Sequence, residues 1–246
     1  MRVVAIVQAR MGSSRLAGKV LFDLGGMPVL GCVTARLQRA ASIAEMAIAT
    51  SSDPGDDPIE AFGRERGVCV IRGSLDDVLA RYAVAAEATR ADAIVRITAD
   101  CPLIDPEIVD AVVGLFLRDG CEYASNTLER SFPRGLDTEV FTRRALERAA
   151  SSAREPYERE HVTPYVYRHA APARIGSFVD PSGVDRSAWR WTLDTLQDYT
   201  FLRALVQALA PLPVQRITTA DAIAVLERDP ELLAINADVV QKALDS

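Results

Sequence analysis

Residues 3–19 read VVAIVQARMGSSRLAGK, an apolar run followed by a loop rich in small and basic residues. The run Val3–Val7 predicts a buried first strand, because continuous apolar and β-branched residues suit the interior of a sheet. Gly12 and Ser13 allow the loop at 8–19 to turn tightly and to point amide groups at a ligand. The loop also carries three cations, Arg10, Arg15 and Lys19. Cations and amides that follow a strand suit the triphosphate of a nucleotide.

A solvated basic loop is the alternative interpretation, and it is disfavoured because such loops usually mix Lys and Arg with Asp and Glu. Two common nucleotide-binding loops are excluded. The stretch lacks the G-x-G-x-x-G glycines of a dinucleotide-binding loop and the G-x-x-x-x-G-K-[ST] order of a P-loop. A dinucleotide-dependent oxidoreductase is therefore disfavoured.

Composition is typical of one α/β domain, since 49% of the 246 residues are hydrophobic and can bury a substantial core. The net charge is −6 and no basic tract stands out, so nucleic acid is not an expected partner. No apolar run approaches the ~20 residues that span a bilayer. Met1-Arg2 leads directly into the first strand, without room for a signal peptide, and the four cysteines form no C-x-x-C pair. We expect a cytoplasmic protein with reduced thiols and no membrane partner.

Apolar, β-branched runs alternate with helical patterns over the first 120 residues. Further strands are expected at residues 47–50, 68–71 and 93–98, and helices at 28–40, 59–66 and about 75–89. This alternation predicts a Rossmann-like α/β fold, with a mostly parallel sheet and helices on both faces. Ligands bind such sheets at the carboxyl ends of the strands. Polar loops follow the four strands at residues 8–19, 51–57, 72–74 and 98–102, so they would share one edge.

From about residue 121 the pattern is mixed. Short strands are expected at 123–126, 137–141, 175–179 and 189–193, with helices at 142–150 and 155–169. The chain from residue 195 on is mostly helical. We therefore expect one domain over residues 1–246. It would comprise a nucleotide-binding half (1–120), an acceptor-binding and dimerisation region (121–194) and C-terminal helices (195–246).

Two aspartates are candidate metal ligands. Asp100 follows the predicted strand at 93–98, and Asp105-Pro106 downstream already has the pattern of a helix N-cap. Asp100 is thereby left for another role. Mg²⁺ prefers hard oxygen ligands and is often held by one or two carboxylates and by substrate phosphates. Asp194 ends the segment RWTLD and could equally be the N-cap of the helix that follows it.

The stretch at 9–21, ARMGSSRLAGKVL, resembles the signature of the sugar cytidylyltransferases. That signature reads roughly A-R-x-x-S-x-R-L-P-G-K-P-L in the 3-deoxy-manno-octulosonate branch and A-R-x-G-S-x-x-x-x-x-K in the acylneuraminate branch. Ala17 and Val20 stand where the first branch usually carries Pro. The chain is most similar to a third, spore-coat-polysaccharide (SpsF-like) branch, and this resemblance covers nearly all of it. Its motifs are matched by RGSLDDVLARY (72–82), RITADCPLIDP (96–106), SNT (125–127), GLDTEVF (135–141), EREHVTPY (158–165) and RWTLD (190–194).

The resemblance implies a nucleotide-diphospho-sugar transferase fold and a magnesium-dependent reaction in which CTP and a sugar hydroxyl give a CMP-sugar and pyrophosphate. The acceptor would be a sugar acid of the nonulosonate or octulosonate kind, used for surface polysaccharide or glycoconjugate synthesis. Arg15, Lys19 and Asp100 would be catalytic. Asp194 matches the first Asp of the late V-D-T-P-E-D-L segment of the octulosonate enzymes and would hold Mg²⁺ together with Asp100. Nucleotide binding is expected of Gln8, Ala9, Arg10, Met11, Gly12, Ser13, Arg15, Lys19, Arg72, Gly73, Asp77 and Thr98.

Acceptor-binding residues are expected among the polar groups of the later motifs, namely Asn126, Asp137, Glu139 and His161. A solvated strand face explains Glu139 equally well, and His161 is more simply explained as a structural hydrogen bonder. Arg134 or Arg143 could meet the carboxylate of an acidic sugar, although a surface role is the ordinary one for Arg.

Related cytidylyltransferases pair through their second halves, so a homodimer is expected too. Residues 121–175 would form its contact, because aromatic and apolar residues recur there. Two other functions stay open: transfer from another nucleotide or to a non-sugar acceptor, and an inactive nucleotide-binding relative. The inactive relative is disfavoured because a protein that only binds a nucleotide does not need both Asp100 and Asp194.

Overall fold

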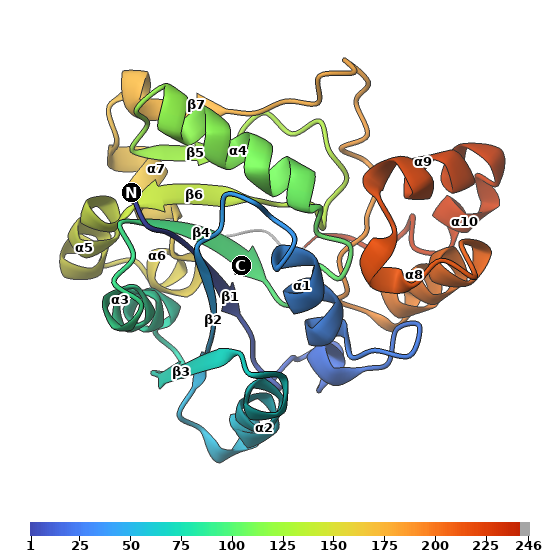
Figure 1. Ribbon diagram of the computed structural model, residues 1–246, viewed down its shortest axis with the longest axis horizontal. Coiled ribbons are helices and arrows are strands. Elements are labelled where there is room, and N and C mark those ends of the chain that lie inside the picture. Colours follow the sequence, from blue (N-terminus) through green and yellow to red (C-terminus); the bar gives the residue numbers. More distant parts are fainter. Residues whose placement is uncertain (242–246) are drawn as a thin grey trace.

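A seven-stranded sheet forms the centre of the computed structural model, which describes residues 1–241 (Figure 1). The strand order is β3-β2-β1-β4-β6-β5-β7. The strands are β1 Val3–Gln8, β2 Glu45–Ser51, β3 Cys69–Gly73, β4 Ala93–Thr98, β5 Tyr123–Ser125, β6 Glu139–Thr142 and β7 Ile175–Ser177. Strands β1 to β4 run parallel, and β6 is antiparallel to both β4 and β5. The predicted mostly parallel sheet is confirmed.

Helices cover both faces of this sheet, as the alternating pattern predicts (Figure 1). The helices are α1 Val29–Leu37, α2 Asp57–Arg66, α3 Val78–Ala88, α4 Pro106–Arg118, α5 Arg143–Ser152, α6 Pro156–His161, α7 Pro164–His169, α8 Leu196–Ala208, α9 Thr219–Arg228 and α10 Glu231–Ala234. Core residues of α1, α2 and α4 pack in one apolar cluster, and those of α3, α5 and α7 in another. The last three helices gather at one side of the molecule (Figure 1).

Strand β1 shows why an unbroken apolar run suits the middle of such a sheet. Its alternate residues point to opposite faces. Val3, Ala5 and Val7 enter the cluster with α1, whereas Val4 and Ile6 enter the cluster with α3. Both faces are buried, so every position must be apolar.

Two elements of the second half differ from their prediction. The residues 189–193 form no strand: the chain makes only an isolated bridge between Arg134 and Arg190. The segment instead contacts two different loops: the amide of Trp191 donates to the carbonyl of Arg134, and the amide of Leu193 donates to the carbonyl of Asp100. The single helix predicted at 155–169 is two helices.

The break between α6 and α7 has a local cause. Val162 takes a left-handed backbone with φ of +71°. Pro164 then stands at the first position of α7, where its missing amide costs nothing. Among residues 1–241, no helix combines the length and apolar character that crossing a membrane requires.

Candidate active site

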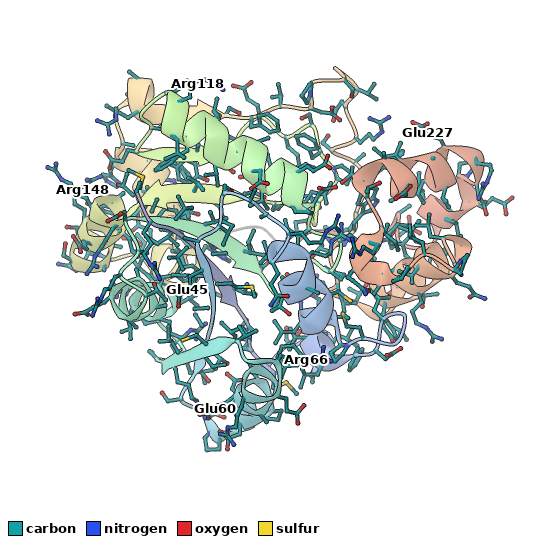
Figure 2. The ribbon with its side chains drawn as sticks, viewed as in Figure 1. Glu45, Glu60, Arg66, Arg118, Arg148 and Glu227 are labelled. Atoms are coloured by element: carbon teal, nitrogen blue, oxygen red, sulfur yellow. The ribbon has the colours of Figure 1, made fainter. Side chains whose placement is uncertain are left out.

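The ammonium of Lys19 joins two carboxylates at the carboxyl end of the sheet. Its Nζ lies 2.8 Å from Asp100 Oδ2 and 2.6 Å from Asp194 Oδ1. Figure 2 labels charged side chains at the periphery of the molecule, among them Arg118 and Glu227, whereas Lys19 is only 8% exposed. A lysine this buried is normally paired, and here it has two partners.

Backbone contacts bring the two aspartates together. Asp100 follows the end of β4, and its carbonyl accepts the amide of Leu193 at 2.8 Å. Asp194 is therefore held beside Asp100 although the two are far apart in sequence. Thr195, and not Asp194, caps α8, with its side chain accepting the amide of Asp198. Asp105 likewise caps α4 as predicted. Neither Asp100 nor Asp194 serves as a cap.

Two further cations contact Asp194. Arg15 lies 3.1 Å and Arg190 2.7 Å from its Oδ2. Arg190 is in turn fixed by Asp198 at 2.9 Å. Arg15 is the more open of the two, with 35% of its side chain exposed. Arg15 is therefore able to reach a ligand while Arg190 holds the carboxylate in place.

The charges in this cluster reinforce one another. Burial opposes the positive charge of Lys19, but the two carboxylates outweigh burial, and the pKa of Lys19 is raised. Burial also opposes the negative charge of Asp100. The neighbouring ammonium outweighs that effect and lowers the pKa of Asp100. Lys19 is thus protonated and Asp100 ionised at neutral pH.

The loop at 8–19 is anchored by Asp56. This buried carboxylate accepts the amide of Met11 at 2.7 Å and the hydroxyl of Ser51. The loop closes where the amide of Gly18 donates to Met11 at 2.9 Å. Gly18 has φ of +72°, a left-handed conformation that favours glycine. This turn leads directly into the 3₁₀ helix Lys19–Leu21 and so sets the position of Lys19.

A cavity of about 770 Å³ opens beside the Lys19 cluster. Its walls come from the carboxyl ends of β1 and β4, the loop before β6, and the start of α7. Arg15, Asp100 and Asp194 line it together with residues of the second half. The volume falls in the range of sites that bind small molecules.

Glu139, in the second-half wall, is bound by three side chains. Arg96 lies directly opposite it in the β4–β6 register and forms an ion pair with it. The hydroxyls of Tyr123 and Thr163 each donate to Glu139 Oε1 at 2.6 Å. Nearby, Arg130 binds Asp137 through two hydrogen bonds of 2.6 and 2.9 Å.

Half of the predicted site residues meet at this cavity or directly beside it. The sequence-predicted residues that line it are Gln8, Arg15, Thr98, Asp100, Asp137, Glu139, His161 and Asp194, and Lys19 lies directly behind the two aspartates. They come from both halves of the chain. The first strand, the fourth strand and the second-half motifs therefore converge on one place.

Some predicted nucleotide-binding residues lie elsewhere. Arg72 forms ion pairs with Asp57 and Glu60, and Gly73 packs against Arg81, away from the cavity lining. Asp77 caps α3. The role of these residues in nucleotide binding stays a prediction.

The loop at 8–19 and the second half of the chain also hold predicted residues whose polar atoms contact other groups of the protein. The amide of Ala9 donates to Ala49, Ser13 accepts the amide of Leu16, and Arg10 lies 3.9 Å from Glu160. Gly12 faces open space. The buried side chain of Asn126 ties down the next loop by binding the carbonyl of Leu136 and the amide of Thr138.

Three lining residues, Arg96, Arg130 and Gln241, were not predicted from the sequence, and only Arg96 carried a usable signal. Arg96 is a charged residue within the apolar run of β4, which is the kind of exception that marks a site. Arg130 and Gln241 stand in segments without a distinctive pattern. Gln241 reaches the cluster from the far end of the chain, where its side-chain oxygen accepts from Arg190.

An α/β sheet with a lysine, two aspartates and a basic loop at the carboxyl ends of its strands suits a nucleotidyltransferase. The chain belongs to the cytidylyltransferase family, whose model matches residues 4–213. It is 33% identical to the spore coat polysaccharide biosynthesis protein SpsF of Bacillus subtilis (strain 168), over 93% of this chain and 95% of that relative.

Two further relatives agree with this assignment. A 3-deoxy-manno-octulosonate cytidylyltransferase of Anaeromyxobacter dehalogenans (strain 2CP-1) is 32% identical over 68% of this chain and 74% of its own. The solved structure of a cytidylyltransferase from Leptospira borgpetersenii serovar Hardjo-bovis (strain JB197) superposes with a TM-score of 0.89 at 35% identity. It covers 99% of this chain and all of that one (100%). The predicted family is confirmed.

Proposed function

We propose that the protein transfers CMP from CTP to a hydroxyl of a sugar acid, releasing pyrophosphate, in a reaction that needs Mg²⁺. The observation that carries this proposal is the ammonium of Lys19 between Asp100 and Asp194 at the edge of the cavity. The product would enter surface polysaccharide or glycoconjugate synthesis. Two relatives, a spore coat polysaccharide biosynthesis protein and an octulosonate cytidylyltransferase, support the pathway and the acceptor class.

The donor set of the two aspartates fits a divalent cation. Both offer hard carboxylate oxygens, which Mg²⁺ prefers, and both already share one positive charge. Within residues 1–241 no group of three or more His, Cys, Asp or Glu side chains converges. A cation held by Asp100 and Asp194 would thus need oxygens from the nucleotide or from water as well. When bound, it would neutralise the α-phosphate and lower the pKa of the attacking hydroxyl.

The chain's own residues account for most of the positioning. The hydroxyl oxygen of the acceptor forms a bond to the α-phosphorus, the bond from that phosphorus to the oxygen that bridges to the β-phosphate breaks, and the hydroxyl proton passes to water. Negative charge grows on the leaving pyrophosphate. Arg15 and Lys19 supply fixed positive charge where it grows, which is the main source of catalysis in such transfers.

Gln8 adds a feature that suits a ligand. It ends β1 and lines the cavity, yet its side-chain oxygen is buried without a hydrogen-bond partner among the described residues. A buried polar atom without a partner costs about 1–3 kcal/mol. A donor on the nucleotide or the acceptor would remove that cost.

We expect CTP to be preferred over UTP, and both over purine triphosphates. A pyrimidine site reads the exocyclic group at C4 by hydrogen bonds, and a mismatched buried group lowers kcat/KM by about tenfold to a few hundredfold. The test measures pyrophosphate release with each of the four triphosphates, Mg²⁺ and a panel of nonulosonic and octulosonic acids. A preference for UTP or for a purine would contradict the assignment to CTP.

The homodimer stays a prediction, to be tested by light scattering at micromolar concentration. Many aromatic and apolar residues of 121–175 are buried within the chain's own core, including Tyr123, Phe132 and Phe141. Tyr157 and Tyr165 keep partial exposure and are left to form a contact. A particle of twice 26.7 kDa is expected, and a particle of that single-chain mass would contradict the dimer.

A further inference from the structure

Arg134 differs from the other arginines of the cavity. Arg15 contacts Asp194, Arg96 contacts Glu139, and Arg130 contacts Asp137. The side chain of Arg134 also lines the cavity, but across residues 1–241 no carboxylate lies within ion-pair distance of it and no acceptor takes its hydrogen bonds. It is a guanidinium with its donors available.

The backbone of Arg134 is held in place from both sides. Its amide donates to Trp189 at 2.9 Å, and its carbonyl accepts from Trp191 at 2.6 Å. The next residue, Gly135, has φ of +107°, and a Cβ there would stand 2.6 Å from the carbonyl carbon of Trp191. Only glycine fits such an approach. The position of Arg134 at the cavity wall is therefore built into the fold.

The electrostatic surroundings of Arg134 call for an anion. Burial lowers its pKa, and repulsion by Arg130 and Arg190 acts in the same direction. Asp137 attracts Arg134, but the two oxygens of that carboxylate are already bound by Arg130. An incoming anion would satisfy Arg134 without breaking an existing ion pair.

We propose that Arg134 binds the carboxylate of the acceptor sugar acid. This inference rests on the proposed function and deepens it by naming the residue that selects an acidic sugar. A guanidinium binds a carboxylate through two parallel hydrogen bonds, which recognise both its charge and its planar shape.

The location of Arg134 favours the acceptor over the triphosphate. It lies in the loop between β5 and β6, close in sequence to Arg130, and not in the loop at 8–19 that is expected to bind the triphosphate. It also lines a second, adjoining cavity of about 340 Å³, whose walls include Trp189, Leu233 and Val239. Arg134 thus lies between the main cavity and a smaller cavity that is partly apolar. The triphosphate offers the same oxyanion chemistry, so the test must separate the two sources.

The test compares Arg134→Ala with the wild type in steady-state kinetics. We expect KM for the sugar acid to rise about tenfold to a hundredfold, as for the loss of a charge-assisted hydrogen-bonded pair, with KM for CTP unchanged. For Arg134→Lys we expect a KM for the sugar acid between those of the wild type and Arg134→Ala. An ammonium keeps the positive charge but cannot form the two parallel hydrogen bonds of a guanidinium. The methyl ester of the same sugar acid should be a poor substrate for the wild type and no poorer for Arg134→Ala.

Arg143→Ala is the matched control. Arg143 is paired with Glu147 on the surface of α5, away from the cavity lining, so this variant should leave both KM values unchanged. Thermal unfolding checks that each variant folds. Higher KM for CTP alone would place Arg134 at the triphosphate and overturn the inference, as would an unchanged KM for the sugar acid. A wild type that transfers CMP to no sugar acid, but to another acceptor, would instead contradict the proposed function and remove the inference with it.

Discussion

Asp100→Asn should lower kcat by about a hundredfold to a thousandfold, because a neutral amide binds Mg²⁺ far more weakly than a carboxylate does. The protein should stay folded. The contact that Asp100 makes with Leu193 uses the backbone carbonyl, which the substitution leaves in place. Lys19 also keeps its contact with Asp194. The loss is therefore expected in turnover and not in structure.

The measurement is pyrophosphate release at saturating CTP over a series of Mg²⁺ concentrations. A partial recovery at high Mg²⁺ is expected if the variant binds the cation weakly. Asp119→Asn serves as the control, since Asp119 is an exposed aspartate at the end of α4, where it pairs with Arg118 on the surface. Near-normal kcat for Asp100→Asn at saturating Mg²⁺ would remove Asp100 from the metal site.

Lys19→Ala should lower kcat/KM for CTP by about a hundredfold to a thousandfold, since one fixed cation near growing negative charge is removed. The variant also leaves Asp100 and Asp194 without the ammonium between them. Asp194 keeps two cations, Arg15 and Arg190, whereas Asp100 loses the group that holds its pKa low. The pKa of Asp100 should therefore rise more in this variant than that of Asp194.

Calorimetric titration of CTP and single-turnover kinetics separate binding from chemistry in this variant. Both should worsen. Lys19→Arg keeps the charge but brings a larger, planar group into a site that is 8% exposed, so partial activity is expected. Arg118→Ala removes a cation at the periphery and should change neither quantity (Figure 2). An unaltered CTP affinity together with unaltered turnover in Lys19→Ala would show that the loop at 8–19 does not bind the triphosphate.

Local patterns predicted much of the fold. The apolar runs of β1 and β4 were recognisable because both faces of these strands are buried. The cap at Asp105 was predictable since capping depends on residues adjacent in sequence. The segment 189–193 was misassigned because alternating large residues look alike whether the chain pairs with a strand or crosses two loops.

The candidate site was only partly predictable for the same reason. Polar residues at strand ends could be expected to meet, and Asp100 and Thr98 lie where that rule places them. The partners of each side chain could not be foreseen. Arg72 forms ion pairs with acidic residues of α2. The side chain of Asn126 forms its hydrogen bonds with the backbone of the loop before β6. Contacts of that kind depend on packing.

The sequence by itself determined the strands of the parallel part of the sheet, the edge at which the polar loops gather, and the family, because burial periodicity and short motifs are local properties. Only the tertiary structure decided which charges share a partner. Lys19 meets Asp100 across 81 positions and Asp194 across 175. Within residues 1–241 no carboxylate forms an ion pair with Arg134, and the nearby Asp137 is bound by Arg130. Such pairings depend on how distant loops pack at one edge of the sheet, and no pattern of neighbouring residues encodes them.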